Sequence, residues 1–199
     1  MSVDVRFKHP FACIIAGPTR SGKSKFCVRF LNNHSSFCTE RFKGGNSWCF
    51  SERTSIPTGE MDALNLNIRY DEGKPVDFKN KRGEPCLFIL DDLLNDAHSS
   101  GLVCDLLTKG SHHPNISVIL ITQNIFHQSE HCRDNSLKAK YLVLLKKFRD
   151  RSQLSRLAQV YPKHCVDLYD SYLHANAILH CYLVLDLSQD INDLLRFRT

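Results

Sequence analysis

The chain contains 199 residues, 42% of them hydrophobic, and its formal net charge of +5 is mildly basic. This length and apolar content suffice for one core, so we predict a single domain over residues 1–199, and the charge permits contact with nucleic acid without requiring it. Nine cysteines, no two closer than 11 residues, exclude a C-x-x-C zinc or redox pair and favour reduced thiols over a secreted disulfide scaffold, and no apolar run approaches the roughly 20 residues that span a bilayer. We therefore expect a soluble intracellular protein with no membrane partner.

The first predicted element is a buried strand over residues 11–16, a short apolar run typical of a parallel sheet. It leads into GPTRSGKS, which meets every position of the phosphate-binding pattern G-x-x-x-x-G-K-[ST], the Walker A motif. Glycines let the backbone approach an anion, and the N–H groups that open a helix attract it. We expect Lys23 to reach the β- and γ-phosphates of ATP and the Ser24 hydroxyl to ligate Mg²⁺. The predicted nucleotide-binding residues are Gly17, Pro18, Thr19, Arg20, Ser21, Gly22, Lys23 and Ser24.

The residues after this motif predict a helix and then weaker strands. Apolar residues at i, i+1, i+4 and i+5 from Phe26 place one hydrophobic stripe on the helix. Residues 47–50 predict a second strand, and residues 65–70 a third. The segment from Asp71 to Pro85 has the composition of a surface loop.

Five apolar residues at 86–90 run directly into two aspartates, which is the Walker B pattern. A buried strand that ends in a carboxylate can place Asp91 beside the Mg²⁺ bound by Ser24, where the charge of the metal offsets the cost of burying an ion. We expect Asp92 to orient or deprotonate the attacking water. The alternative interpretation is that both aspartates cap the next helix.

Residues 100–109 predict a helix, and residues 116–121 predict a clear strand. This strand delivers polar residues to the carboxyl edge of the sheet, where ligands bind in open α/β folds. We expect Gln123 to sense the γ-phosphate or to hold the water, with Asn124 as the second choice. A polar strand end in solvent is the alternative.

Four further elements complete the pattern: a strand at 141–145, helices at 152–160 and 165–174, and a strand at 181–187. Strands alternate with helices along the chain, and no internal repeat is present. The sequence therefore predicts an α/β P-loop NTPase with a mostly parallel sheet covered by helices on both faces, a RecA/ASCE-like core.

A basic segment from Lys138 to Arg156 carries seven basic residues against one acidic residue, a local net charge of +6. Such a cluster can contact DNA phosphates, or it can present an arginine to the nucleotide of a neighbouring subunit. A solvated basic surface is the alternative.

Two pairs of histidines, at 112–113 and at 127 and 131, could suggest metal ligands. They lack carboxylate or cysteine partners at regular spacing. We therefore do not predict a metal site at these histidines.

The order of these motifs resembles that of the viral double-stranded DNA packaging ATPases of the FtsK/HerA superfamily, of the poxvirus type also carried by Maverick/Polinton elements. The resemblance implies an ATP-hydrolysing motor that forms a homo-oligomeric ring, a hexamer or similar, around duplex DNA and moves it into a preformed capsid. Its partners would be double-stranded DNA and capsid or portal vertex proteins, in the host cytoplasm or nucleus at sites of virus assembly, or in the virion. The resembling stretches cover almost the whole chain and are HPFACIIAGPTRSGKS (9–24), CLFILDDL (86–93), TKGSHHPNISVILITQN (108–124), KKFRDRSQ (146–153) and LRFRT (195–199).

By this resemblance the roles of Lys23, Ser24, Asp91 and Gln123 carry over directly. Members of the superfamily commonly have Glu where this chain has Asp92, whose shorter side chain must lie closer to the water. In FtsK-like motors the finger arginine precedes the strand equivalent to 116–121.

That neighbourhood contains no arginine in this chain, only Lys109, His112 and His113. Our candidates for the finger are instead Arg149 and Arg151, which lie in the family-like KKFRDRSQ stretch. Arg133 is the third choice.

Two other classes of function share the phosphate-binding loop. A small-molecule or nucleotide kinase has a similar size, but we find no arginine-rich lid, and a Walker B motif with a polar-ended strand suits hydrolysis by water better. A nucleotide-switched assembly protein, without translocation activity, would bind ATP to govern its partners. Product analysis separates the kinase from the motor, and the effect of Asp92→Asn separates the switch from the motor.

Overall fold

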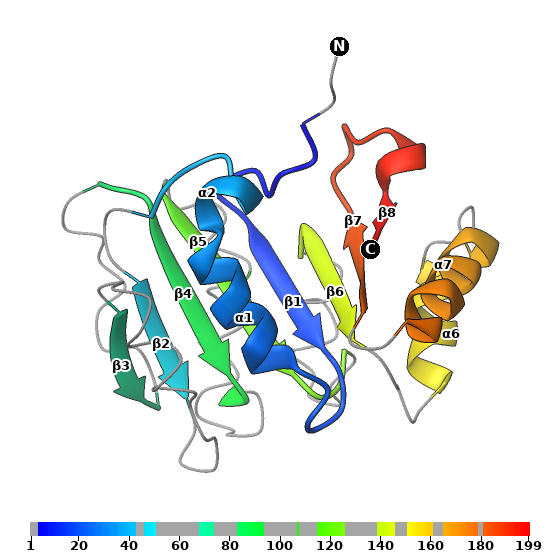
Figure 1. Ribbon diagram of the computed structural model, residues 1–199, viewed down its shortest axis with the longest axis horizontal. Coiled ribbons are helices and arrows are strands. Elements are labelled where there is room, and N and C mark those ends of the chain that lie inside the picture. Colours follow the sequence, from blue (N-terminus) through cyan, green and yellow to red (C-terminus); the bar gives the residue numbers. More distant parts are fainter. Residues whose placement is uncertain are drawn as a thin grey trace.

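The computed structural model describes residues 4–42, 46–50, 68–73, 83–93, 107, 115–125, 139–145, 151–160, 165–178 and 181–199. An eight-stranded sheet in the order β3-β2-β4-β5-β1-β6-β7-β8 runs through it (Figure 1). In this order the strands from β3 through β2, β4, β5 and β1 to β6 pair in parallel. β7 then pairs antiparallel with β6, and β8 pairs antiparallel with β7. The predicted mostly parallel sheet is thus confirmed. The strand bounds are β1 Ala12–Ala16, β2 Asn46–Phe50, β3 Ile68–Glu72, β4 Cys86–Asp91, β5 Ile116–Thr122, β6 Tyr141–Leu145, β7 Tyr182–Asp186 and β8 Phe197–Arg198.

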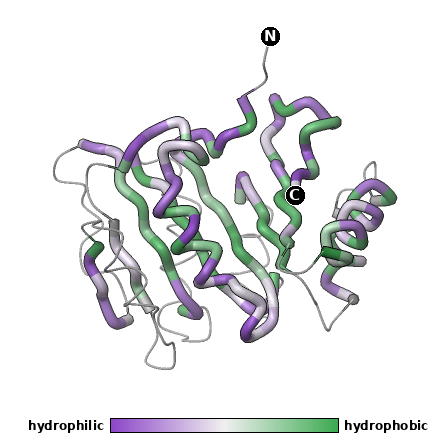
Figure 2. The backbone as a smooth tube through the Cα atoms, in the orientation of Figure 1, coloured by the Kyte–Doolittle hydropathy of each residue, from purple (hydrophilic) through white to green (hydrophobic). Residues whose placement is uncertain are grey.

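The four central strands are apolar along nearly their whole length because both of their faces are covered. Every residue of β4, β5, β1 and β6 is buried. Figure 2 shows the same strands as hydrophobic through the middle of the molecule. A continuous apolar run, in place of alternation, is what a parallel strand inside a doubly covered sheet requires.

Helices cover the two faces of the sheet. On one face α1 (Lys23–Asn32) packs with Cys13 and Ile15 of β1, and the short α2 (His34–Phe37) follows it. On the other face α6 (Arg151–Val160) and α7 (Cys165–Ala177) pack with Leu142 and Leu144 of β6. The predicted coverage of both faces is confirmed for the described residues. None of the described helices combines the length and hydropathy that a membrane span would need.

Most predicted strand positions agree with the structure, but the boundary of β3 was wrong. The strand begins at Ile68 and continues through Asp71 and Glu72, which the sequence assigned to a surface loop. Its register with β2 pairs Asp71 with Cys49, so the backbone pairing with a neighbouring strand determines the extent of β3, whatever the polarity of its side chains. The predicted helix at 100–109 lies outside the described residues except for Leu107, which is helical and buried.

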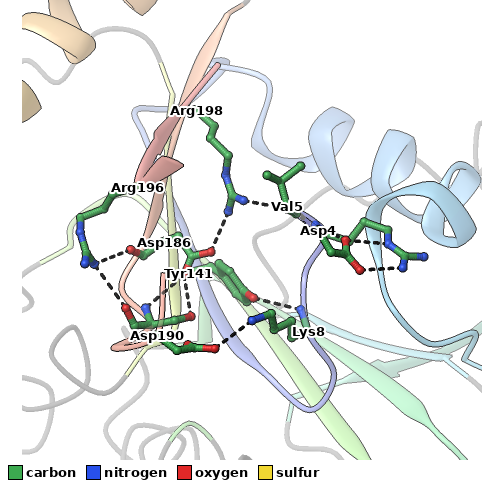
Figure 3. A network of polar contacts seen from close by, with 10 residues as sticks. Asp4, Val5, Lys8, Tyr141, Asp186, Asp190, Arg196 and Arg198 are labelled. Atoms are coloured by element: carbon green, nitrogen blue, oxygen red, sulfur yellow. Dashed lines mark hydrogen bonds and ion pairs between the residues drawn. The ribbon is translucent and has the colours of Figure 1, made fainter. Parts of the chain in front are cut away.

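The last two strands are tied to the N-terminal segment by polar contacts (Figure 3). Arg198 of β8 forms an ion pair with Asp186 of β7, with 3.0 Å between Nη2 and Oδ2, and both side chains are largely buried. Lys8 forms an ion pair with Asp190 at 2.9 Å, and its backbone N–H donates to the Tyr141 hydroxyl at 2.9 Å. These contacts, together with the 3-10 turn at Asp193–Leu195, hold β8 at the edge of the sheet.

Candidate active site

The phosphate-binding loop connects β1 to α1 as the Walker A motif predicts. The loop turns through a hydrogen bond from the Ser21 N–H to the Pro18 carbonyl oxygen at 3.1 Å. Gly22 then stands at the N-cap of α1 with φ of 100°, a conformation that residues with a Cβ rarely adopt. The first helical bond follows from Phe26 N–H to the Gly22 carbonyl at 2.8 Å, so the open N–H groups of the helix face the loop.

The loop is also closely packed at Gly17. A Cβ at this position would lie 2.7 Å from Ser21 Oγ and 3.1 Å from Leu145 Cβ. The Ser21 hydroxyl that fills this space is buried and has no hydrogen-bond partner among the described residues. Arg20 has φ of 64°, so a second residue of the loop, besides Gly22, has a positive φ, and this conformation costs energy at a residue with a Cβ. Backbone strain of this kind is concentrated at functional sites.

Lys23 lies inside the loop that it follows. Its Nζ donates hydrogen bonds to the carbonyl oxygens of Gly17 at 2.8 Å and Pro18 at 3.0 Å. Burial lowers the pKa of Lys23, and the charges of Asp91 and Asp92 oppose that shift. Both Walker B carboxylates therefore lie within electrostatic reach of the Walker A lysine.

Asp91 is the last residue of β4 and is 3% exposed. Burial and the neighbouring Asp92 charge raise the pKa of Asp91 to about 6, although the Trp48 indole and Lys23 act in the opposite direction. Asp91 Oδ2 and Trp48 Nε1 are nevertheless both buried without a partner in hydrogen-bonding geometry. The indole is therefore a polar neighbour of the carboxylate and not its hydrogen-bond donor.

Asp92 turns out of the strand immediately after Asp91. It has φ of 55° and is half-buried, and its backbone N–H donates to the Ile121 carbonyl at 3.2 Å. A positive φ at a non-glycine residue is uncommon and costs energy, though aspartate tolerates it better than most residues. This turn gives the two carboxylates different surroundings, since Asp91 is buried and Asp92 is half-buried.

The sheet order brings the predicted site residues to one edge. β5 lies between β1 and β4, and its register pairs Thr122 with Ala16 on one side and Ile121 with Asp91 on the other. Gly17 N–H also donates to the Thr122 carbonyl at 3.3 Å. Gln123 follows directly and is exposed at this edge. The phosphate-binding loop, the Walker B aspartates and Gln123 thus meet at the carboxyl ends of three adjacent parallel strands.

One residue of this region was not among the predicted site residues. Gln153 of α6 is 7% exposed, and its Oε1 accepts a hydrogen bond from Ile125 N–H at 3.0 Å while its Nε2 donates to Asn124 Oδ1 at 2.9 Å. A signal was present in the sequence: Gln153 lies four residues before Leu157, on the apolar face of α6, where a polar side chain needs a partner.

A cavity of about 510 Å³ lies beside the phosphate-binding loop, along α1. Its loop end is formed by Ser21 and Gly22, and Phe26 of α1 and Tyr182 of β7 contribute aromatic walls. The two rings stand edge to face with centroids 4.8 Å apart. Basic side chains also line the cavity, among them Arg198, and no acidic side chain does so among the described residues.

The donors at the sheet edge fit a hard cation. The Ser24 hydroxyl stands at the start of α1 and is half-buried, and Asp91 offers a buried carboxylate oxygen without a partner, which is the oxygen chemistry that Mg²⁺ prefers. Among the described residues no cluster of three or more His, Cys, Asp or Glu could hold a metal ion.

Several predicted residues cannot be placed at this site. The histidines at 112, 113, 127 and 131 lie outside the described residues, as do Arg149 and Arg133. Arg151 is the first residue of α6, but its side chain is not described. The finger arginine therefore stays a prediction.

Comparison with known proteins gives the fold a context. No family model matches the sequence, and no curated protein sequence matches it. The structure is similar to the genome-packaging NTPase B204 of Sulfolobus turreted icosahedral virus 2 in complex with AMP, with a TM-score of 0.56 and 13% identity over 96% of both chains. The same protein in complex with ATP-gammaS gives a TM-score of 0.55 and 12% identity over 94% of this chain and 95% of that chain. B204, the DNA-packaging ATPase of Sulfolobus turreted icosahedral virus, gives a TM-score of 0.57 and 13% identity over 92% of this chain and 95% of that chain, so a shared fold spans nearly the whole of both chains.

Proposed function

We propose that the protein is a Mg²⁺-dependent ATPase motor that packages double-stranded viral DNA into a capsid. The observation that carries this proposal is the meeting of the phosphate-binding loop, Asp91, Asp92 and Gln123 at the carboxyl ends of β1, β4 and β5. A fold shared with viral packaging NTPases supports the packaging role. The resemblance to the FtsK/HerA packaging ATPases of the poxvirus and Maverick/Polinton type supports it further, and residues 1–199 act as one ATPase domain.

The residues at this edge have different roles in the proposed reaction. The N–H groups of the loop and the Lys23 ammonium bind the β- and γ-phosphates, and Lys23 exchanges its bonds to the Gly17 and Pro18 carbonyls for bonds to phosphate oxygens. Ser24 and Asp91 hold Mg²⁺, which when bound neutralises charge on the phosphates. Asp92 orients the attacking water or accepts its proton, and Gln123 contacts the γ-phosphate or that water.

The cavity along α1 provides room for the nucleoside. It adjoins Ser21 and Gly22 of the loop, so a nucleotide whose phosphates occupy the loop can place its base against Phe26 and Tyr182. The shared fold with an NTPase that has been captured with AMP and with ATP-gammaS supports a nucleotide at this site.

The motor works as a homo-oligomeric ring, a hexamer or similar, that surrounds duplex DNA. The basic segment from Lys138 to Arg156 contacts DNA phosphates or supplies Arg149 or Arg151 to the γ-phosphate of the neighbouring subunit. Capsid or portal vertex proteins are its further partners. It acts in the host cytoplasm or nucleus at sites of virus assembly, or in the virion.

ATP turnover measured with and without long duplex DNA, together with the mass of the particle in the same buffer, tests this function. We expect inorganic phosphate as the product, stimulation by long duplex DNA and a ring-sized mass. Monomeric hydrolysis indifferent to DNA would overturn the motor. Transfer of the phosphoryl group to a small acceptor would instead identify a kinase.

A further inference from the structure

The backbone that carries Gln123 is fixed from both sides. On the strand side Thr122 Oγ1 accepts a hydrogen bond from Asn124 N–H at 3.2 Å and donates to the Asn124 carbonyl at 3.0 Å. This local turn places Gln123 at its apex, exposed at the sheet edge. The position of Gln123 therefore depends on what holds Asn124.

Gln153 holds Asn124 and the residue after it. Ile125 N–H can only donate, so it fixes the Gln153 amide with Oε1 toward the backbone and Nε2 toward Asn124 Oδ1. Gln153 and Ile125 are both buried, at 7% and 5% exposure. Because both polar ends of a buried amide are used, the bond pair fixes one geometry and leaves no alternative partner in solvent.

The strand residues before Gln123 also form backbone hydrogen bonds with the two Walker motifs. Gly17 N–H donates to the Thr122 carbonyl, and Asp92 N–H donates to the Ile121 carbonyl. Residues 121–125 are thus hydrogen-bonded to the phosphate-binding loop, to the end of β4 and, through Gln153, to α6. Leu154 of α6 packs in the same apolar cluster as Ile125, so the polar contact lies within a tightly packed layer.

We propose that Gln153 is a positioning residue that keeps Gln123 in its hydrolysis-competent place and couples the nucleotide state at the sheet edge to α6. The inference rests on the proposed function, because it assigns Gln123 to the γ-phosphate or its water. A contact between Gln123 and the γ-phosphate pulls on Asn124, and the two Gln153 bonds transmit that displacement to α6, the helix that begins at Arg151. This coupling between the nucleotide and α6 requires no change in the affinity of the phosphate-binding loop for ATP.

Two substitutions on one helix test this role. Gln153→Leu puts an apolar side chain of comparable volume in place of the amide and removes both bonds, whereas Gln159→Leu makes the same change at an exposed position of α6. We expect Gln153→Leu to lower kcat about 10- to 100-fold, because small displacements of positioned groups have effects of that size. The Kd for ATP should change less than about threefold, since the loop is untouched. Gln159→Leu should match the wild type.

Gln153→Glu provides the conservative variant. It keeps an acceptor for Ile125 N–H, and the Asn124 amide can rotate to donate to the carboxylate. We expect it to recover most of the lost kcat. If Gln153→Leu fails to fold, Asn124→Ala removes one of the two bonds from an exposed residue. It should lower kcat and also weaken the response of α6 to nucleotide in hydrogen exchange, which the loss of a direct contact between Asn124 and the phosphate would leave intact.

Hydrogen exchange of residues 151–160 with AMPPCP and with ADP gives a readout independent of turnover. We expect α6 to differ between the two nucleotides in the wild type and in Gln159→Leu, and to lose that difference in Gln153→Leu. Unchanged kcat in Gln153→Leu, or an equal loss of ATP affinity and kcat, would overturn the positioning role while the proposed function stands. A wild-type protein that neither binds nor hydrolyses ATP would overturn the proposed function, and with it this inference.

Discussion

Replacement of Asp91 by asparagine should make the metal-free protein more stable while it removes hydrolysis. Asp91 is 3% exposed, and its pKa is raised from 3.8 to about 6, first by burial and then by the Asp92 charge. The folded protein therefore holds a proton on Asp91 up to about pH 6, whereas the unfolded chain releases it near pH 4. Between these values the folded state binds more protons, so this carboxylate makes the free energy of unfolding fall as the pH rises.

The size of the effect follows from the shift. Each pKa unit corresponds to about 1.4 kcal/mol, so a shift of about two units means that the ionised Asp91 lowers the free energy of unfolding by about 3 kcal/mol above pH 7. Asparagine has a similar shape and no charge, so Asp91→Asn should raise that free energy by about 2 to 3 kcal/mol at neutral pH. For a chain of this length the midpoint of thermal unfolding should rise by roughly 5 to 10 °C.

Denaturant unfolding at pH 7.5 in EDTA, followed by tryptophan fluorescence, measures the difference. Trp48 is the only tryptophan of the chain and is fully buried, so its emission reports the transition. At pH 5 roughly half of the advantage of Asp91→Asn should remain, because the folded protein then keeps Asp91 protonated while the unfolded chain still releases that proton. The advantage should largely disappear only near roughly pH 3.5, below the pKa of an aspartate in the unfolded chain. Carboxylates other than Asp92, whose charge interacts with that of Asp91, titrate in both proteins alike and cancel in the comparison.

Asp170→Asn on α7 is the matched control, because Asp170 is exposed and the same charge is removed. Its free energy of unfolding should stay within about 0.5 kcal/mol of the wild type. Equal or lower stability of Asp91→Asn at pH 7.5, or an advantage that does not depend on pH, would refute the view that Asp91 is a strained buried carboxylate. Addition of Mg²⁺ and ATP should stabilise the wild type more than the variant, since a ligand that binds the folded state raises its stability.

Three further predictions concern the proposed reaction. Lys23→Ala should abolish phosphate release and leave the circular dichroism spectrum unchanged, because Lys23 contacts only loop carbonyls in the described hydrogen bonds, and normal turnover in this variant would contradict the site. Asp92→Asn should retain ATP in a filter-binding assay and lose hydrolysis by about 100-fold or more, and a nucleotide switch would instead keep its partner binding and output. Arg149→Ala or Arg151→Ala should lower DNA-stimulated turnover of the assembled ring by about 1,000-fold, and the finger assignment fails if neither does so.

The elements that were predicted best from the sequence are those in which every residue is buried. β6 begins and ends where its apolar run does, because every residue of it is buried on both faces. β3 lacks such a run, and its extent follows from pairing with β2, which no local pattern encodes. The link between Lys8 and Asp190 joins residues 182 positions apart and could not be anticipated from spacing either.

The parts of the site that consist of contiguous sequence motifs were predictable, and the contacts between distant segments were not. GPTRSGKS and the apolar run before Asp91 are contiguous patterns, and the structure brings both to the edge that a parallel sheet implies. The raised pKa of Asp91 depends on burial beneath neighbouring elements, and the Gln153 contact crosses 28 positions. Such properties arise from packing between distant segments, so sequence periodicity could at most indicate that Gln153 lies on the apolar face of α6.

Among the described residues, most of the buried polar side-chain atoms without a hydrogen-bond partner lie at the candidate site. Four such side-chain atoms have no hydrogen-bond partner, and three of them, Ser21 Oγ, Asp91 Oδ2 and Trp48 Nε1, belong to the loop or to the Walker B carboxylate and its neighbour. An unpartnered buried polar group costs about 1 to 3 kcal/mol, so their concentration at one edge is a local cost within an otherwise satisfied core. The strained φ values of Arg20 and Asp92 fall at the same edge. A bound nucleotide and cation can supply partners for the hydroxyl and the carboxylate, so binding should remove part of this local cost.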